Sequence, residues 1–437
     1  MKALIMRIAA LAALVLAGSP TTALAKTDIV WWHAMQGVLG ERVGEIAAKF
    51  NASQKDYEVK AVFKGSYPET LTAAIAAYRA KQSPHVVQVF EAGTQTMLSS
   101  GAVYPVHQLM KDNGIAIDWN DLIGPVKSYY SSGGNLASMA FNSSTPILYY
   151  NKNQFRGAGL DDRNPPKTWP EIEAAARRLR NAGVPCGFTT HWPSWVNVEN
   201  FSALHNQPIA TQSNGLGGIN AELTINNPLL VRHIGALSNW QKTRIFDYGG
   251  RGISAEPKFQ KAECGIFLGS SATNADIRAN SRFEVGYGML PYWPDVADAP
   301  QNSIIGGATL WVLNNRPTSE YKGVAKFFAF LSRPEVQATW HQNTGYLPVT
   351  RAAYDLSKAK GFYDRNPGAE ISIQQITLKP PTENSKGLRL GSFVLIRDII
   401  EGELEEAFSG RKTAKDALDA ATKRGNELLR QFERANR

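Results

Sequence analysis

The N-terminal part of the chain alternates short apolar runs with longer segments in which apolar residues recur at helical spacing. The sequences DIVWWHAM at 28–35, YEVKAVF at 57–63 and HVVQVF at 85–90 predict strands. Between them, the segments 39–50 and 67–78 place their apolar residues on one face of a helix. Strands that are each followed by a helix predict an α/β architecture.

Helix starts are marked as well. Ser66 and Glu69 match the S-x-x-E capping box, and Thr168 and Glu171 match the same pattern ahead of a second apolar run. Later strands are predicted at VPCGF, FEVGYGMLPYWP and IIGGATLWVL, and two helices near 393–408 and 413–434 close the chain. The segment GFTTHWPSWVNVENF at 187–201 fits neither the helical nor the alternating pattern.

Residues 1–25 have the features of a secretory signal peptide. Lys2 and Arg7 lie at the start of an apolar run, and Ala23 and Ala25 flank Leu24 in a small-x-small cleavage site. No cysteine stands at this site, so no lipid anchor is expected. We therefore expect export to the periplasm.

The formal net charge of +9 falls to +7 when Lys2 and Arg7 leave with the signal peptide. The remaining basic residues are scattered among acidic ones, as in SGRKTAKDALDAATKRGNELL, whereas a nucleic-acid surface clusters them. This distribution predicts no nucleic-acid partner. The apolar fraction of 43% is sufficient for two domains of ordinary size.

The only two cysteines, Cys186 and Cys264, leave two interpretations open. A disulfide would suit an oxidising compartment, and two buried thiols fit the sequence equally well. The spacing does not decide between them.

The order of these elements, and several specific stretches, resemble a known family. WWHAM, FNSSTPILYYNK, NVENFSA, APQNSIIGGATLWV, WHQNTGYLPVT and KGLRLG together resemble the extracytoplasmic solute-binding proteins of ABC importers, and among them those that bind sn-glycerol 3-phosphate. The resemblance implies a two-lobe α/β periplasmic binding protein with its ligand in a cleft between lobes. It implies lobes formed by 26–139 with 306–343 and by 140–305 with 344–437. It also implies a monomer that delivers its ligand to an inner-membrane ABC permease, with no cofactor and no metal.

A cleft for glycerol phosphate needs hydrogen-bond donors and a cation for the anion, and a carboxylate and aromatic faces for the polyol. The ligand contacts that the resemblance implies fall on residues of these kinds: Tyr67, Glu91, Ser144, Trp192, Trp195, Ser270, Ser271, Gly307, Tyr346 and Arg397.

Arg397 is a cation on the buried stripe of its predicted helix, and the resemblance makes it a phosphate contact. The alternative is an arginine that pairs with Glu401 one turn further on. Ser270 and Ser271 follow a short apolar strand, so they can face an anion or simply cap a helix.

Glu91 ends an apolar strand and is interpreted as the acceptor of the glycerol hydroxyls, with a salt bridge inside its lobe as the alternative. Trp192 and Trp195 are expected to form a wall of the cleft, against the glycerol carbons or a substituent beyond the phosphate. The alternative is an aromatic corner of the second lobe. Tyr67, Ser144, Gly307 and Tyr346 either contact the phosphate or serve as rim, turn and bulge residues.

An exported enzyme is the competing class of function. The seven histidines show no H-x-x-x-H or H-x-H spacing, and the sequence lacks G-x-S-x-G and a phosphate loop. We therefore expect a binding protein, not a secreted phosphodiesterase. Within the binding class, the alternative ligands are a glycerophosphodiester such as glycerophosphocholine and an oligosaccharide.

Overall fold

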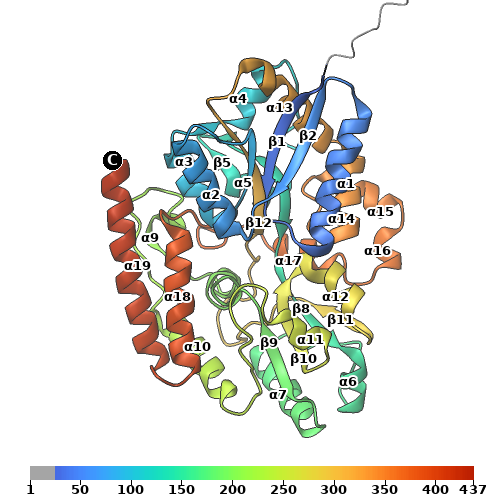
Figure 1. Cartoon of the computed structure of the whole chain (residues 1–437). Helices are drawn as coiled ribbons and strands as arrows, with labels where there is room; N and C mark the ends of the chain where they lie inside the picture. Colours follow the sequence, from blue (N-terminus) through green and yellow to red (C-terminus); the bar gives the residue numbers. More distant parts are fainter. Residues whose placement is uncertain (1–24) are drawn as a thin grey trace, which may run out of the picture.

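The computed structural model describes residues 25–437, so the predicted signal peptide lies outside the described residues except for Ala25. Within this range every helix is too short or too polar to cross a bilayer. The chain forms two main β-sheets, one in the upper and one in the lower half of Figure 1, each flanked by helices.

The first sheet combines strands from the start of the chain with one that returns late. Its strands are β1 (Thr27–His33), β2 (Tyr57–Phe63), β3 (Val86–Phe90), β4 (Val103–Tyr104), β7 (Met139–Ser144) and β12 (Gly306–Leu313). Their order is β2-β1-β3-β12-β4, with β7 paired to β12. The first three strands are parallel, and β12 is antiparallel to its neighbours. The start of β12 therefore lies at the same edge as the carboxyl ends of β1 and β3.

The second sheet has the order β11-β8-β10-β9. Its strands are β8 (Pro146–Asn151), β9 (Cys186–Thr190), β10 (Cys264–Ser270) and β11 (Val285–Gly288). Strands β9 and β10 are parallel, so both deliver their carboxyl ends to one edge. A small hairpin of β5 (Ser131–Ser132) and β6 (Asn135–Leu136) stands apart from both sheets.

Helices connect the strands and cover the sheets. In the first half of the chain they are α1 (Gly37–Ser53), α2 (Tyr67–Arg79), η1 (Glu91–Gly93), α3 (Thr94–Ser99), α4 (Val106–Asp112), α5 (Gly124–Tyr130), α6 (Lys152–Gly157), α7 (Trp169–Asn181), η2 (Trp195–Asn200), α8 (Phe201–Leu204) and α9 (Thr211–Asn214). In the second half they are α10 (Pro228–Gln241), α11 (Glu256–Gln260), η3 (Ser271–Thr273), α12 (Asn274–Asn280), α13 (Thr318–Leu331), α14 (Pro334–Thr344), α15 (Arg351–Ala359), α16 (Phe362–Arg365), α17 (Ile371–Ile376), α18 (Phe393–Phe408) and α19 (Ala414–Asn436).

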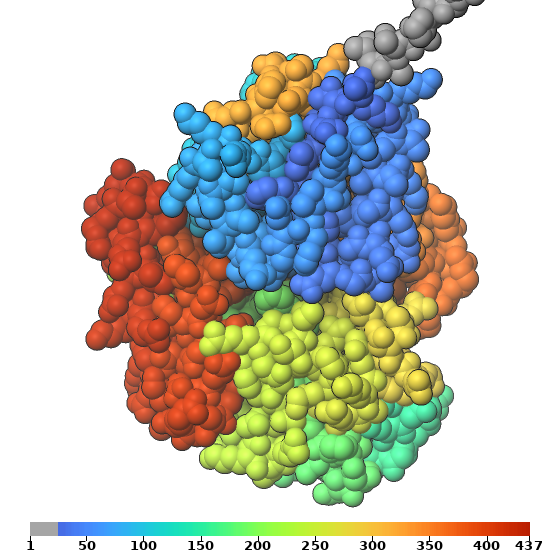
Figure 2. All heavy atoms as spheres, in the orientation of Figure 1, coloured from blue at the N-terminus to red at the C-terminus, as the bar shows by residue number. Residues whose placement is uncertain are grey.

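The predicted helix starts are confirmed. Ser66 and Glu69 form a capping box at α2, and the Thr168 N–H donates to Glu171 at 3.0 Å at the start of α7. Helices α10, α18 and α19 pack against one another. In Figure 2 the two C-terminal helices, in red, run along one side of the molecule beside both halves.

The chain passes from the first sheet to the second within one residue. Strand β7 ends at Ser144 and β8 begins at Pro146, so the crossing lies at Thr145, just beyond the segment FNSS. The chain returns between the end of β11 at Gly288 and the start of β12 at Gly306. Thr145 and Ser303 join the two connections through a hydrogen bond of 2.6 Å between their hydroxyls.

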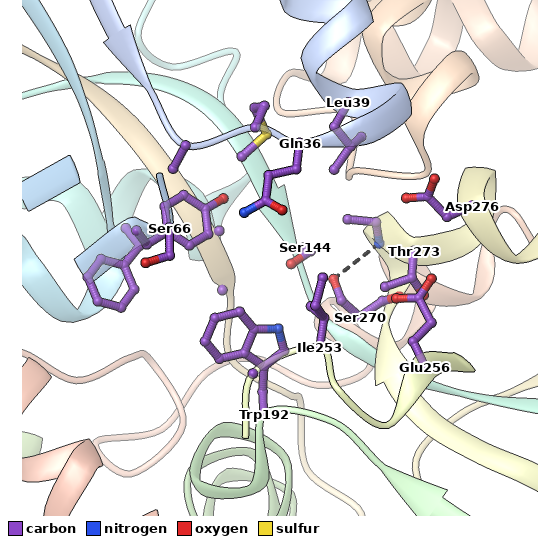
Figure 3. A pocket seen from close by; sticks show the side chains of 18 of the residues that line it. Gln36, Leu39, Ser66, Ser144, Trp192, Ile253, Glu256, Ser270, Thr273 and Asp276 are labelled. Carbon is purple, nitrogen blue, oxygen red and sulfur yellow. Dashed lines mark hydrogen bonds between the residues drawn. The ribbon is translucent and has the colours of Figure 1, made fainter. Parts of the chain in front are cut away.

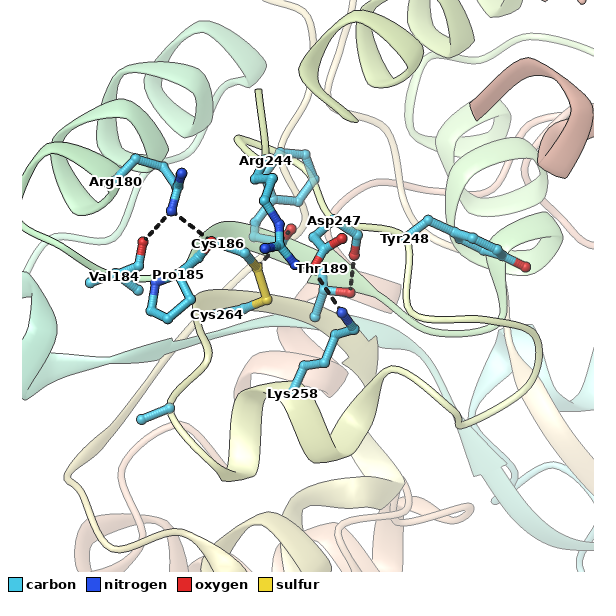
Figure 4. Close-up of a disulfide and its surroundings, with 12 residues drawn as sticks. Arg180, Val184, Pro185, Cys186, Thr189, Arg244, Asp247, Tyr248, Lys258 and Cys264 are labelled. Carbon is cyan, nitrogen blue, oxygen red and sulfur yellow. Dashed lines mark hydrogen bonds and ion pairs between the residues drawn. A yellow bond between two sulfur atoms is a disulfide. The ribbon is translucent and has the colours of Figure 1, made fainter. Parts of the chain in front are cut away.

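The two cysteines form a disulfide between β9 and β10, which resolves the question that the sequence left open. Cys186 and Cys264 are paired residues of the parallel ladder, and both are fully buried (Figure 4). On the same side of the sheet, Lys258 donates to Asp247 at 2.7 Å. The bond ties together the two strands whose carboxyl ends face the first sheet.

Candidate functional site

A cavity of about 610 Å³ lies between the two sheets. It is lined by the segments that follow β1 and β3, by the end of β7 and the start of β12, and by the segments that follow β9 and β10. Figure 3 shows Ser66 and Ser144 from the first half facing the same space as Trp192 and Ser270 from the second. Open α/β sheets place ligands outside the carboxyl ends of their strands, and this cavity has that position.

The cleft collects the residues that the sequence predicts for a ligand, with one exception. Ser271 does not line it: its N–H donates to the Thr145 carbonyl at 2.9 Å, and its buried hydroxyl has no partner among the described residues. The predicted residues that do line the cavity are Tyr67, Glu91, Ser144, Trp192, Trp195, Ser270, Gly307, Tyr346 and Arg397.

Arg397 is held at the cleft by two carboxylates. Its Nε donates to Glu199 Oε1 at 2.7 Å and its Nη2 to Glu199 Oε2 at 2.6 Å. Nη2 also lies 2.5 Å from Glu91 Oε1. The two parallel bonds to Glu199 fix the plane of the guanidinium. Nη1 has no partner within residues 25–437, so it is free to meet a ligand in the cavity that Arg397 lines.

Burial and charge oppose each other in this cluster. Burial disfavours the charge of Arg397, but Glu199 and Glu91 outweigh it and raise the pKa of Arg397 well above its usual range. Burial raises the pKa of Glu91, and the neighbouring Arg397 opposes that rise. The guanidinium therefore stays charged in a site that is almost closed to solvent.

One alternative from the sequence is wrong. Arg397 lies on the buried face of α18 as predicted, but among the described residues its ion pairs go to Glu199 and Glu91, not to Glu401. Glu401 is itself buried, and this burial raises the pKa of its carboxyl to about 7. Helical spacing pointed to the neighbour one turn away, whereas tertiary packing brings in an acid from η2.

The two tryptophans come from a segment with unusual backbone geometry. Trp192 is half-buried and has a φ of 44°, in the left-handed region. Trp195 begins η2, which is a π-helix, and its indole lies so close to Gly306 that a Cβ there would approach it to 2.4 Å. The wider i→i+5 turns of a π-helix do not follow the spacing of an α-helix, which explains why the pattern from Trp195 onward showed no helix.

Two tyrosine hydroxyls enter the cleft from the first half of the molecule. Tyr67 stacks on Phe90 with the ring centroids 5.3 Å apart, and its hydroxyl accepts a hydrogen bond from Asn142 Nδ2 at 2.9 Å. Among the described residues, the Tyr346 hydroxyl donates to Met35 Sδ, at 3.8 Å. Sulfur is a weak hydrogen-bond acceptor, so the Tyr346 hydroxyl can donate to a ligand oxygen in place of Met35 Sδ.

Gly307 and Ser270 both line the cleft, the first with its backbone and the second with a hydroxyl group. Gly307 has a φ of 95°, and a Cβ there would meet the Asn142 carbonyl oxygen at 2.0 Å, so only glycine fits. Ser270 caps η3, since its Oγ accepts from the Ala272 N–H at 3.1 Å. This is the capping alternative from the sequence. The Ser270 N–H donates to His191 Nε2 at 2.5 Å.

Sequence reasoning missed three acids. Glu199 is fully buried and orients Arg397, and its only signal in the sequence was an acid within the motif NVENFSA. Glu256 and Asp276 also line the cleft. They stand on α11 and α12, which are too short to show a periodic pattern.

The chain matches the model of the bacterial extracellular solute-binding protein family over residues 45–370. It belongs to this family.

Among relatives, the chain is 48% identical over 417 residues to the sn-glycerol-3-phosphate-binding periplasmic protein UgpB of Yersinia pseudotuberculosis, which covers 95% of both chains. It is 46% identical to UgpB of Salmonella typhimurium, with the same coverage. Among solved structures, it is similar to UgpB from Mycobacterium tuberculosis in complex with glycerophosphocholine, with a TM-score of 0.79, 22% identity and coverage of 93% of this chain and 99% of that one. Maltose-bound MalE3 of T. maritima aligns with a TM-score of 0.75, 16% identity and coverage of 92% and 100%.

These findings confirm the resemblance and the two-lobe α/β binding-protein fold predicted from the sequence. The contacts of the individual residues with a ligand remain predictions.

Proposed function

We propose that the chain is the periplasmic substrate-binding component of an ABC importer, which captures sn-glycerol 3-phosphate and delivers it to an inner-membrane permease. The observation that carries this proposal is the identity of 48% to a protein named for that ligand, over 95% of both chains. The cleft contains the groups that such a ligand requires: a charged guanidinium, hydroxyls, close backbone and a buried carboxylate.

The proposed site divides the ligand between its ends. Arg397 Nη1 and the hydroxyls of Ser144, Ser270 and Tyr346 take the phosphate, with Ser271 supporting the loop behind Ser270. Glu91 accepts the glycerol hydroxyls, and Trp192 and Trp195 cover the glycerol carbons. Tyr67 and Gly307 complete the surface that contacts the ligand. Asn142 lies beside both, since its side chain donates to the Tyr67 hydroxyl and its carbonyl oxygen lies against Gly307.

The proposed lobes are those expected from the sequence, 26–139 with 306–343 and 140–305 with 344–437, except that the first boundary moves to Thr145 because β7 belongs to the first sheet. The return of β12 to the sheet of β1–β3 supports this division, as does the placement of β8–β11 in a separate sheet. We propose a monomer without cofactor, whose lobes close on the ligand and present a joint surface to the permease.

Titration calorimetry of the mature protein with glycerol 3-phosphate, glycerophosphocholine and maltose tests the function directly. Saturable binding of the first ligand supports the proposal. Binding of maltose alone would replace it with a sugar-binding role.

Glu91→Gln is expected to weaken glycerol 3-phosphate binding by about 1 to 3 kcal/mol, because one acceptor oxygen becomes a donor. The loss should be similar for glycerophosphocholine, which carries the same free hydroxyls, and absent for inorganic phosphate. Calorimetry with the three ligands measures it. Normal affinity for both organic ligands would show that Glu91 serves only as the partner of Arg397.

Ligand binding is expected to shift or quench tryptophan fluorescence and to reduce the radius of gyration, because closure buries Trp192 against the ligand. Emission spectra and small-angle scattering at saturating glycerol 3-phosphate measure both effects. A Trp192→Phe variant serves as the control that assigns the optical change to this indole. Unchanged spectra and radius would place the two tryptophans outside a closing cleft.

A glycerophosphodiester is the second candidate ligand, and the size of the cleft favours it. A cavity of about 610 Å³ is in the range of pockets that hold drug-sized molecules, and glycerol 3-phosphate alone leaves much of it unfilled. We further propose that the chain binds such ligands without turning them over. Release of glycerol 3-phosphate from glycerophosphocholine by the purified protein would contradict this.

A further inference from the structure

One end of the cleft is acidic. Glu256 at the start of α11 and Asp276 on α12 both line the cavity, and Figure 3 shows them on the side away from Ser66, beyond Ser270. The proposed function puts the glycerol at Glu91 and the phosphate at Arg397 and Ser270. A substituent beyond the phosphate would therefore extend past Ser270 toward these two carboxylates.

No cation within residues 25–437 neutralises either acid. Glu256 is 7% exposed, and the only hydrogen bond that a described residue makes to its carboxylate comes from Gln260 Nε2, at 2.8 Å to Oε1. Asp276 is half-buried and its carboxylate has no hydrogen bond and no ion pair with a described residue. Burial, together with the nearby Asp276, raises the pKa of Glu256 to about 8. Burial is also the main reason why the pKa of Asp276 is raised, and the negative charge of Glu41 adds to it.

With a pKa of about 8, Glu256 is mainly protonated near neutral pH while the cleft is empty, and a cation beside it would favour the charged carboxylate. The arrangement therefore favours a ligand that supplies a cation. A metal ion does not fit. The described residues hold no third His, Cys, Asp or Glu that would join these two acids as a ligand, whereas hard divalent cations take about six or more oxygens. An organic cation attached to a ligand already in the cleft needs only one or two acceptors and a flat hydrophobic wall. Trp192 and Ile253 line the cavity between the two ends.

We propose that Glu256 and Asp276 form a subsite for the ammonium head group of a glycerophosphodiester, an inference that rests on the proposed function of the cleft. The carboxylates accept the N–H groups of a primary ammonium, and they attract a quaternary ammonium by charge alone. The diester of ethanolamine therefore gains more from the subsite than the diester of choline, whose methyl groups pack on the indole of Trp192.

The test compares glycerophosphoethanolamine and glycerophosphocholine with glycerophosphoglycerol, a diester of similar size whose head group is uncharged. Calorimetry of the wild-type mature protein is expected to show tighter binding of the cationic diesters. Asp276→Asn is expected to reduce the preference for glycerophosphoethanolamine over glycerophosphoglycerol by about tenfold, the loss of one charge-assisted bond. Glu256→Gln should change the same ratio in the same direction.

Glu41→Gln is the matched control, because Glu41 is an exposed acid near Asp276 that does not line the cleft. If Glu41→Gln changes the preference for glycerophosphoethanolamine over glycerophosphoglycerol as much as Asp276→Asn does, the preference arises from long-range attraction, and the proposed subsite is wrong. Equal changes for the charged and uncharged diesters in Asp276→Asn and Glu256→Gln would overturn it too. If the wild type binds glycerol 3-phosphate but shows no preference among diesters, only the subsite fails. If it binds none of these ligands, the proposed function fails with it.

Discussion

Arg397→Ala is expected to lower the free energy of unfolding by about 3 to 5 kcal/mol and to weaken glycerol 3-phosphate binding by about 2 to 4 kcal/mol. The loss of stability arises because Arg397 is the ion-pair partner of both Glu199, which is fully buried, and Glu91, and its removal leaves both carboxyl groups in the interior without a cation. The loss of affinity arises because Arg397 is the only arginine among the described residues that line the cleft, and its Nη1 has no partner among them.

The two effects separate in a paired variant. Arg397→Met with Glu199→Gln removes the cation together with one of its anions, and replacing a buried pair by neutral groups is often tolerated. Urea unfolding should therefore show most of the stability recovered, whereas calorimetry should show affinity still low. Arg397→Lys keeps the charge but cannot make the bidentate contact to Glu199, so it should recover only part of both quantities.

Two outcomes would contradict this account. An unchanged unfolding free energy in Arg397→Ala would mean that water reaches and solvates both carboxylates. Unchanged affinity in a folded Arg397→Ala protein would remove the phosphate contact from this residue, and the hydroxyls of the cleft would have to bind the anion alone.

Most of the fold could be predicted from the sequence because its signals are local. The strands at β1, β2 and β3 and the helix α18 appear where apolar periodicity placed them, and both capping boxes form. Several elements escaped prediction, among them α10, α15 and the hairpin of β5 and β6. At the cleft the missed element is η2, because the i→i+5 spacing of a π-helix matches neither the helical nor the strand pattern.

The site could be predicted only in part, and for a related reason. Glu91 directly follows β3 and Ser270 is the last residue of β10, so the local sequence pattern predicts their position at the cleft. The partner of Arg397 is not local: Glu199 lies 198 residues away along the chain, and α18 brings the two together only after the lobe has folded. The acids Glu256 and Asp276 are also tertiary features, because α11 and α12 contact each other but carry no amphipathic signal of their own.

Removal of the disulfide is expected to lower the free energy of unfolding by about 4 kcal/mol, because the bond closes a loop of 78 residues that gains freedom in the unfolded chain. Both cysteines are buried in the ladder between β9 and β10, so alanine replacements also leave small cavities. Urea unfolding of Cys186→Ala, Cys264→Ala and the double variant measures the loss.

The three variants together identify the cause of that loss. Either single replacement breaks the bond, so each should cost nearly the full amount and the double variant should cost little more. Additive losses would instead point to packing.

The ladder hydrogen bonds between β9 and β10 remain in every variant, and they keep the carboxyl ends that carry Trp192 and Ser270 in place. Affinity for glycerol 3-phosphate should therefore stay within about twofold at 25 °C, where the variants remain folded, since the bond acts mainly on the unfolded state. A large loss of affinity in a folded double variant would mean that the disulfide sets the shape of the cleft itself.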